Sequence, residues 1–214
     1  MTEPTITSEP KPAVGTMEAH GVIAVNSRHA GVRRLRRQGH IPSIHGTKVW
    51  RSSFALMEYF EDFPIPNQAK VVDVGCGWGI LSIYLAKHFN AEVLAVDADE
   101  AVGPYLDLQC ELNDVSSVSF QHNTLQKLHS DHFAGAHTVI GSDICFWDEL
   151  MRPLHAVIHR AMNSGVEQVI IADPGRDPFW ALTELCDRDL NVEVLRQSTE
   201  EPYPTTKHLL IIEP

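Results

Sequence analysis

Acidic residues stand at or next to the carboxyl ends of three apolar runs in the sequence. Asp73 lies one position from the end of the first run, and Asp97 and Asp143 close two later ones. If these runs are parallel strands of a doubly wound sheet, their carboxyl ends meet at the edge where ligands bind. A carboxylate there suits a cationic ligand, or two hydroxyls held by one acid in a charge-assisted pair. The spacing therefore predicts a ligand site lined by carboxylates at one edge of a sheet.

Alternating glycines follow the first of these acids. Gly75, Gly77 and Gly79 precede an amphipathic segment, a pattern typical of a buried strand, a tight turn and a helix. Side chains here would block a ligand from the backbone, and glycine adopts left-handed turns at little cost. The first N–H groups of the helix are also free to bind a ligand. We therefore predict that this loop, including Cys76, binds a ligand; a tight turn without a ligand is the alternative.

The loop differs from the dinucleotide-binding pattern G-x-G-x-x-G. Ile80 occupies the position of its third glycine, and the glycine falls at Gly79 instead. Asp73 would also repel a pyrophosphate, because both groups are negatively charged. These two observations argue against a nicotinamide cofactor and favour a cationic ligand.

The run D-x-G-x-G-x-G from Asp73 to Gly79 resembles the first motif of the class I S-adenosylmethionine methyltransferases. The resemblance implies that the acid lies near the amino-acid end of S-adenosylmethionine, which carries a sulfonium and an ammonium. It also implies S-adenosylhomocysteine as the product. Asp97 ends the second strand 18 positions beyond Gly79, a distance typical of the acid that binds a ribose. Asp99 is the rival for this role, but its position suits a helix cap better.

Two further segments resemble the seven-strand protein lysine methyltransferases. The pattern G-x-x-V-W ends at Trp50, which the resemblance places beside the cofactor. Asp143 to Phe146 match the D-x-x-(Y/F) signature, in a setting similar to the electron-transfer-flavoprotein β-subunit lysine methyltransferases and their bacterial relatives. Asp143 and Phe146 are therefore the candidate catalytic residues, and Asp143 would hold the acceptor ammonium by a charge-assisted bond. The structural alternative is a capped helix start with two buried aromatic residues.

Two turns at later strand ends leave their roles open. Asn123 follows the third strand, where the family's loop reads the adenine edge; its amide suits that role, and a simple turn asparagine explains it equally well. The turn Asp173-Pro174-Gly175-Arg176 resembles the loop after strand five in the same relatives. Arg176 would bind a substrate acid or a neighbouring carboxylate, and a turn chosen for its geometry alone is the alternative.

The periodicity of apolar residues predicts an α/β fold. Strands alternate with helical segments and the chain ends in a hairpin, so we expect a Rossmann-like, doubly wound, seven-stranded sheet with helices on both faces. The resemblance implies that the sheet is mostly parallel with its last strand antiparallel. Residues 1–18 are rich in Pro, Thr, Ser and Glu and are predicted to be a disordered tail. We expect a single domain over 19–214, with a basic, helical N-terminal cap over 19–66 and the cofactor-binding core over 67–214.

The predicted cap carries five arginines between Arg28 and Arg37. A solvated helix face is the favoured interpretation, because the rest of the chain is acidic; a patch for RNA or an acidic partner is the alternative. Ser52 or Ser53 is predicted to cap the helix that follows Trp50.

Composition argues against several classes of function. The net charge of −11 is unfavourable for whole-protein attraction to nucleic acid or to an anionic membrane. No apolar run is long enough to span a membrane and the N-terminus has no signal-peptide character, so we expect a cytoplasmic protein. The four cysteines are scattered without a C-x-x-C pair and are expected to be reduced. Of the twelve histidines, none shows a ligand spacing supported by its context, so we predict no metal.

Methyl transfer from a sulfonium needs alignment and exclusion of water rather than a covalent intermediate. The resemblance of the D-x-x-F, V-W and D-P-G-R segments implies an S-adenosylmethionine-dependent methyltransferase that N-methylates a protein lysine by in-line displacement, with Trp50, Phe146 and Trp147 as a π-rich mouth. A methyltransferase of the same fold for a small amine or another side chain is the alternative. A non-catalytic S-adenosylmethionine-binding protein is a third possibility. RNA methylation is less favoured, because no N-P-P-Y-like tetrapeptide follows the fourth strand.

Overall fold

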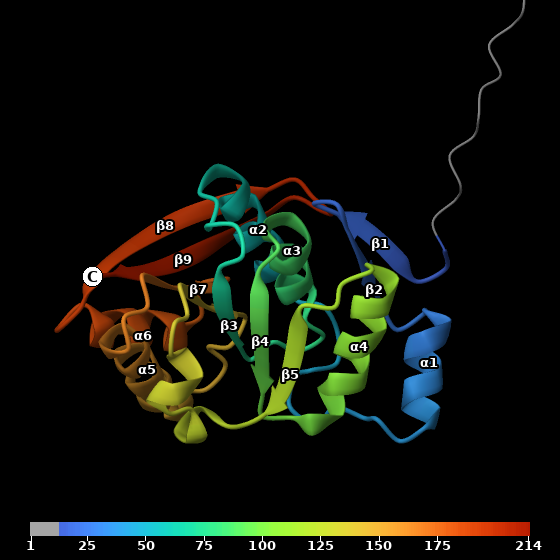
Figure 1. Ribbon diagram of the computed structural model, residues 1–214, viewed down its shortest axis with the longest axis horizontal. Coiled ribbons are helices and arrows are strands. Elements are labelled where there is room, and N and C mark those ends of the chain that lie inside the picture. Colours follow the sequence, from blue (N-terminus) through green and yellow to red (C-terminus); the bar gives the residue numbers. More distant parts are fainter. Residues whose placement is uncertain (1–12) are drawn as a thin grey trace, which may run out of the picture.

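A seven-stranded sheet forms the centre of the molecule in the computed structural model, which describes residues 13–214 (Figure 1). In chain order its strands are β3 (Lys70–Val74), β4 (Glu92–Asp97), β5 (Val118–His122), β6 (Thr138–Ser142), β7 (Gln168–Asp173), β8 (Asn191–Thr199) and β9 (Thr205–Glu213). They lie in the order β5-β4-β3-β6-β7-β9-β8, and every neighbouring pair is parallel except the two pairs that include β9. The predicted sheet, mostly parallel with its last strand antiparallel, is therefore confirmed.

Helices cover both faces of the sheet, which explains the aliphatic character of its central strands. One face carries α2 (Ser52–Asp62) and α3 (Ile80–Phe89) with α4 (Gly103–Leu112) beside them, and the other carries α5 (Asp148–Asn163) and α6 (Asp177–Cys186). Along β3, Val71 packs with α2 and α3, whereas Val72 and Val74 pack with α5 and α6. Alternate side chains of a parallel strand are buried in this way on opposite faces.

Shorter elements complete the connections. They are the 3-10 helices η1 (Glu100–Val102), η2 (Leu125–Lys127) and η3 (Ser130–Phe133). None of the helices in residues 13–214 combines the length and the apolar composition that a membrane span requires.

An N-terminal hairpin, absent from the sequence prediction, packs beside α3 and α4. Its strands β1 (Thr16–Ala19) and β2 (Val22–Val25) pair antiparallel. The predicted disordered tail is therefore wrong for residues 16–18, because these residues find a partner strand whose valines are buried in the core. The part of that prediction that concerns residues 1–12 lies outside the described part of the chain.

One side chain of α4 and the side chain of its C-cap residue bond the backbone of β2. Gln109 Oε1 accepts from the N–H of Val25 at 2.9 Å, and Asn113 Oδ1 accepts from the N–H of Ile23 at 2.7 Å. Both side chains are buried, and Gln109 also donates to the carbonyl of Trp78 at 2.7 Å. These bonds replace the strand neighbour that β2 lacks, as buried backbone groups require.

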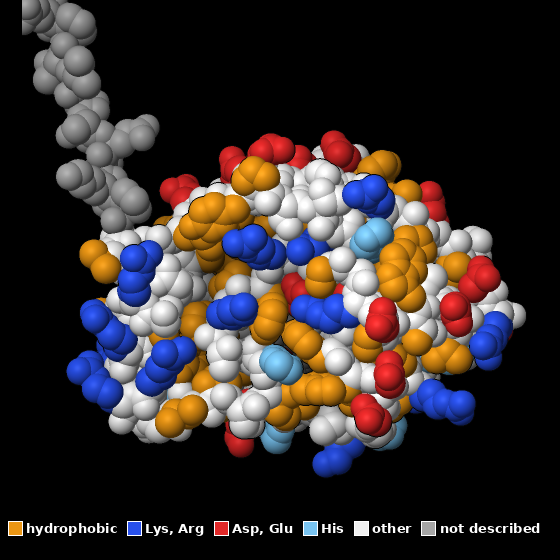
Figure 2. Space-filling view, turned by 180° about the vertical axis from the view of Figure 1, so that it is seen from behind, with side chains coloured by type: hydrophobic (Ala, Val, Ile, Leu, Met, Phe, Trp, Pro, Cys, Tyr) orange, Lys and Arg blue, Asp and Glu red, His pale blue; other side chains and the backbone are white. Residues whose placement is uncertain are grey.

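The arginine-rich segment forms α1 (Ala30–Arg37), which buries Val32 and Leu35 in a cluster shared with α4. Its arginines are exposed, and Figure 2 shows Lys and Arg side chains gathered at the end of the molecule where α1 lies. A helix with one buried apolar edge and a solvated basic face is what the favoured interpretation predicts.

The predicted cap of α2 is wrong. Neither serine at its start caps it, and the bond is supplied by the residue that follows β6: the N–H of Ser52 donates to Asp143 Oδ2 at 2.9 Å. A carboxylate at a helix N-terminus is favourable for the same reason as an ordinary cap. The predicted cap at Asp99 is confirmed, because its side chain accepts from the N–H of Ala101 at the start of η1.

Candidate active site

A pocket opens at the carboxyl edge of the sheet, where the strand order reverses. From β3 the chain builds outward through β4 and β5 and then returns to β6 on the other side of β3. In doubly wound sheets this is the usual ligand site. The pocket is lined by the ends of these strands and by residues 44–50, which we call the front segment; the predicted residues among its lining are Trp50, Gly75, Gly77, Asp97, Asn123, Asp143 and Phe146.

A second hollow lies beside this pocket and shares part of its wall. Its lining supplies the remaining predicted residues, Asp73, Cys76 and Gly79, and it also includes Lys48. Trp50, Gly75 and Gly77 border both hollows. The structure therefore brings every predicted site residue to one edge of the sheet.

The three glycines of the loop all have positive φ, but their surroundings differ. A Cβ at Gly75 would lie 2.4 Å from Ile144, and one at Gly79 would lie 2.6 Å from Leu106, so both glycines permit close packing. A Cβ at Gly77 would meet no heavy atom within 4 Å. Gly77 is thus the glycine whose missing side chain leaves open space in the hollows, as a ligand cradle requires.

Asp73 is buried behind the glycine loop. Its Oδ2 accepts from the hydroxyl of Ser82 on α3 at 2.6 Å. Burial raises its pKa to about 7, against the lowering effect of the Ser82 bond and with a further increase from the charge of Asp97. A carboxyl group with this pKa changes its charge near neutral pH, and a nearby cation would favour its ionised form.

Asp97 stands at the tip of β4 and borders the pocket. Its two oxygens accept from the N–H groups of Gly77 and Asp99, each at 2.9 Å. Burial raises the pKa of Asp97, and these backbone bonds oppose the increase. A carboxylate oxygen can accept more than one bond, so Asp97 keeps the capacity to accept from ligand hydroxyls.

Asp143 lies in the pocket wall, but each of its oxygens already has a partner in the protein. Oδ2 accepts from Ser52 N, and Oδ1 accepts from Arg176 Nη2 at 3.0 Å. Its φ of +54° is unusual for a residue other than glycine, and it turns the chain sharply after β6. Of the roles left open for Arg176, the structure selects the neighbouring carboxylate, because its second nitrogen donates to Asp173.

The group of Asp143, Asp173 and Arg176 therefore contains two carboxyl groups and one guanidinium. Asp173 is fully buried, and burial raises its pKa, although bonds from Arg176 and Gly175 lower it. With both acids ionised the group carries one net negative charge. This charge stands at the pocket wall, where a cationic side chain would be attracted.

Aromatic rings form the mouth of the pocket. The ring of Phe146 stacks on His45 at 4.1 Å between centroids, and Trp50 meets its edge at 5.2 Å. Arg176 Cζ lies 4.2 Å from the Phe146 centroid, within cation–π range. Trp147 is 41% exposed, and its ring centroid lies 4.9 Å from that of His45. The mouth predicted from Trp50, Phe146 and Trp147 is thus present, with His45 as an additional member.

Two residues tie the front segment to the glycine loop and to the turn after β4. No role was predicted for Trp78 from the sequence, and for Asp99 a helix cap was favoured over the ribose role. Trp78, inside the glycine loop, is buried, stacks on Tyr105 at 4.8 Å and donates to the carbonyl of Gly46 at 2.7 Å. Asp99 accepts from the backbone N–H groups of Ser43 and Ile44. A large apolar residue within a glycine-rich turn was the available signal for Trp78, because such a side chain must find a buried site.

Asn123 and Cys76 show simpler environments. Asn123 lines the pocket, and its Oδ1 accepts from the N–H of Thr124 at 3.1 Å, which is a turn interaction. Both of its proposed roles therefore remain compatible with its position.

Burial raises the pKa of the Cys76 thiol well above its usual range. A neutral thiol is a poor nucleophile, so Cys76 contributes backbone to the loop rather than covalent chemistry.

Comparison with known sequences relates this site to methyltransferases. Residues 71–165 match a family model described as a methyltransferase domain. The electron transfer flavoprotein beta subunit lysine methyltransferase of Xenopus laevis is 30% identical over 131 residues, which are 61% of this chain and 52% of that protein. Ribosomal protein L11 methyltransferase of Acetivibrio thermocellus is 39% identical over 67 residues, or 31% of this chain and 21% of that protein. The chain thus spans about half the length of the flavoprotein-directed relatives.

Solved structures confirm the fold. The methyltransferase domain of bacterial CtHen1 superposes with a TM-score of 0.59 at 14% identity, covering 76% of this chain and 97% of that one. Precorrin-6y C5,15-methyltransferase from Geobacter metallireducens gives a TM-score of 0.60 at 10% identity, covering 82% and 94%. At such low identity these likenesses establish architecture, and the predicted Rossmann-like sheet is the architecture they share.

Proposed function

We propose that this class I methyltransferase transfers the methyl group of S-adenosylmethionine to the side chain of a lysine in a protein. The observation that carries the proposal is the position of Asp73, Gly77 and Asp97, which border adjoining hollows at the switch point of the sheet. Gly77 leaves room for a ligand against the backbone. Asp73 and Asp97 form no ion pair with a Lys or Arg in the described chain, so a cationic ligand would supply the missing charge.

Each of these residues suits a different chemical group of S-adenosylmethionine. Asp97 would accept the ribose hydroxyls, Asp73 would stand near the amino-acid end, and Trp50 would cover the junction of the two hollows. When bound, S-adenosylmethionine supplies a methyl group on a positively charged sulfur. The chain's own contribution is to orient the donor and acceptor in line and to keep water out of the pocket.

The charged group and the aromatic mouth on the other side of the pocket suit an amine as the methyl acceptor. A lysine ammonium would be drawn toward the net negative group of Asp143, Asp173 and Arg176, and its methylenes would pass between the rings of the mouth. An ammonium must lose its proton before it can attack. A carboxylate neighbour raises the pKa of the amine, whereas the apolar rings of Phe146 and Trp50 lower it by removing water. The two effects oppose each other, and the rings act in the direction that the neutral nucleophile requires, with the released proton passing to solvent.

The choice of a protein acceptor rests on the relatives. The names of the two groups describe methyltransferases of an electron transfer flavoprotein subunit and of a ribosomal protein. We extend to this chain the common part of those names, which is a protein acceptor, and we take the lysine from the name of the flavoprotein-directed relatives. Purified flavoprotein β subunit and ribosomal protein L11 are accordingly the first acceptors to test.

The test is incubation with S-adenosylmethionine labelled in its methyl group, using these two proteins and a cell extract separated into protein, RNA and small-molecule fractions. We expect label in protein, on a lysine located by mass spectrometry. Asp97→Asn should lose the label, and Asp107→Asn, an exposed change on α4, should keep it. Label confined to small molecules would reject the protein acceptor. Binding of S-adenosylmethionine without label in any fraction would favour a non-catalytic protein.

A further inference from the structure

Two histidines and an aspartate converge on the outer side of α5. His155 and His159 are one turn apart on the helix, and Asp189 lies in the turn between α6 and β8. The two Nε2 atoms are 3.2 Å apart. Asp189 Oδ1 lies 3.4 Å from Nε2 of His155, and Oδ2 lies 3.1 Å from Nε2 of His159.

Protons alone cannot satisfy all three of these contacts. Each Nε2 carries at most one hydrogen. If only one nitrogen is protonated, the lone pair of the other faces the carboxylate of Asp189. If both are protonated, each N–H can donate to one oxygen of Asp189, but the two nitrogens then lie 3.2 Å apart with no hydrogen bond between them. A cation between the two imidazoles and the carboxylate would instead be attracted to all three groups at once.

The separations between the three ligand groups are those that a transition-metal ion such as Zn²⁺ requires. In a tetrahedral site the ligand atoms are separated by about 1.6 times the metal–ligand distance, or roughly 3.3–3.4 Å for a Zn²⁺ bond of about 2.0–2.1 Å. The two Nε2 atoms are 3.2 Å apart, and each lies 3.1 or 3.4 Å from a different oxygen of Asp189, so these separations are close to the edge lengths of a zinc tetrahedron. Two imidazoles and one carboxylate suit Zn²⁺, Co²⁺ or Ni²⁺ better than the oxygen-seeking Mg²⁺ or Ca²⁺.

The three ligands are also held in place before any ion binds. His155 and His159 sit within a regular helix. The turn that carries Asp189 is closed by the N–H groups of Asp189 and Leu190, which both donate to the carbonyl of Cys186. Ligand side chains are 21%, 31% and 49% exposed, so an ion can reach them from solvent. Fixed ligands of this kind lose little conformational entropy on binding.

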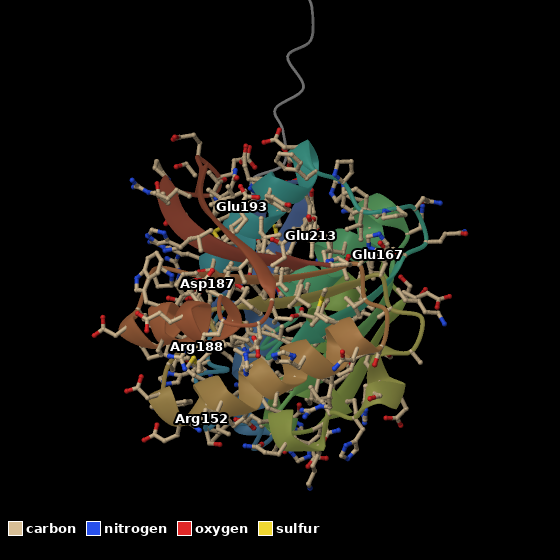
Figure 3. The ribbon with its side chains drawn as sticks, turned by 90° about the vertical axis from the view of Figure 1, so that its left-hand side faces the viewer. Arg152, Glu167, Asp187, Arg188, Glu193 and Glu213 are labelled. Atoms are coloured by element: carbon tan, nitrogen blue, oxygen red, sulfur yellow. The ribbon has the colours of Figure 1, made fainter. Side chains whose placement is uncertain are left out.

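We propose that His155, His159 and Asp189 bind one divalent transition-metal ion, with Zn²⁺ the preferred species and water as its fourth ligand. The ion would join α5 to the turn after α6. Figure 3 views this side of the molecule, where the two helices lie one above the other and Asp187 and Arg188 of that turn are labelled. None of the three ligands lines the methyl-donor pocket, so the site is structural and separate from transfer. The sequence prediction of no metal is revised accordingly.

The experiment uses untagged protein freed of metal by a chelator, because a histidine tag would bind the same ions. Calorimetry with Zn²⁺ should give one ion per chain, and Co²⁺ should give the intense visible bands of tetrahedral coordination. Asp189→Asn and the double variant His155→Gln/His159→Gln should weaken binding at least tenfold and lose those bands. At a Zn²⁺ concentration between the Kd values of the two proteins, the ion should raise the Tm of the wild type more than that of Asp189→Asn.

Matched controls separate this site from general metal affinity. Asp187→Asn changes an exposed acid in the same turn, and His129→Gln removes an exposed histidine elsewhere; both should bind Zn²⁺ as the wild type does. Circular dichroism checks that the variants fold. Equal Zn²⁺ affinity in the wild type and the double histidine variant would overturn the proposal, as would Co²⁺ spectra that no ligand variant changes. None of these measurements depends on methyl transfer.

Discussion

Arg176 donates to Asp143 across the tips of β6 and β7, at 3.0 Å between Nη2 and Oδ1. The bond means that Asp143, the acid of the D-x-x-F signature, is not a free carboxylate in the pocket. It holds an arginine on one oxygen and the N-terminus of α2 on the other. Its influence on an acceptor amine therefore acts through a shared group of charges.

Asp143→Asn is expected to lower methyl transfer tenfold to a hundredfold, while the Kd for S-adenosylmethionine changes little. The amide keeps an acceptor for Ser52 N but removes the net negative charge of the group of Asp143, Asp173 and Arg176, and a charge-assisted bond is worth about 1.5–3 kcal/mol. Asp143→Ala should in addition destabilise the fold, because a buried partner of an ion pair is lost. Equal losses of transfer and cofactor binding in Asp143→Asn would remove its acceptor-side role. Single-turnover rates and calorimetry provide the two measurements.

Asp97→Asn should raise the Kd for both S-adenosylmethionine and S-adenosylhomocysteine at least tenfold. Both ligands present the same ribose, and the variant loses the charge that strengthens two hydroxyl bonds. Asp107→Asn is the matched control, since it changes an exposed acid of α4. Calorimetry that finds unaltered affinity in Asp97→Asn would place the ribose elsewhere.

Binding of S-adenosylmethionine should strengthen as the pH rises toward about 7. Burial raises the pKa of Asp73 to about 7, and the cation binds the ionised form. The affinity should therefore rise by up to about tenfold per pH unit below that value and level off above it. Calorimetry from about pH 5.5 to pH 8.5 measures this, and Asp73→Asn should give a flatter profile.

Stability of the ligand-free protein should show the opposite trend. The pKa of Asp73 is higher in the folded state than the unfolded value of about 3.9, so the folded state binds its proton more tightly. This stabilising contribution is complete below the unfolded pKa and is lost as the pH rises through about 7. Asp97, whose pKa burial also raises, contributes with the same sign. Urea midpoints of the wild type should therefore fall over this range more than those of Asp73→Asn.

Gly75 and Gly77 allow two roles of a loop glycine to be compared: close packing against a neighbour, and open space for a ligand. Gly75→Ala should destabilise the protein by more than about 2 kcal/mol, because the methyl group would clash with Ile144 in addition to the cost of positive φ. Gly77→Ala pays only the backbone cost of about 1–2 kcal/mol, since its Cβ would enter open space. The folded Gly77→Ala protein should nevertheless lose affinity for S-adenosylmethionine. Normal affinity there would show that the open space is not used by the donor.

Gln109→Ala should lower the free energy of unfolding by about 1–3 kcal/mol per backbone group left without a partner. Its side chain serves the N–H of Val25 and the carbonyl of Trp78, both in buried surroundings. Gln126→Ala, at an exposed position of η2, is the control and should stay within about 0.5 kcal/mol of the wild type. An equal, small effect of both substitutions would mean that the N-terminal hairpin adds little to the stability of the core.

The edge of the sheet was predictable from the sequence because its signals are local. An apolar run followed by an acid marks a strand tip, and alternating glycines mark a loop with little room for side chains. Such patterns placed Asp73, Gly77 and Asp97 at one edge without knowledge of any distant contact.

The interactions that assemble the remainder of the site join residues far apart in the chain. Asp143 caps a helix that begins 91 residues earlier, and His45 stacks on Phe146 across a similar separation. Nothing at either position specifies its partner, because several acids or rings would satisfy the same local pattern. The convergence of His155 with Asp189 was hidden for the same reason.

The turn from Asp97 to Asp99 serves two walls of the pocket at once. Asp97 borders the pocket proposed for the methyl donor, and Asp99 holds the backbone at Ser43 and Ile44. In an engineered variant, the β4 side of this pocket and the front segment at its entrance therefore cannot be exchanged as independent modules. A graft that imports a new entrance from another enzyme must bring a compatible β4 turn with it, or rebuild that anchor on its own backbone.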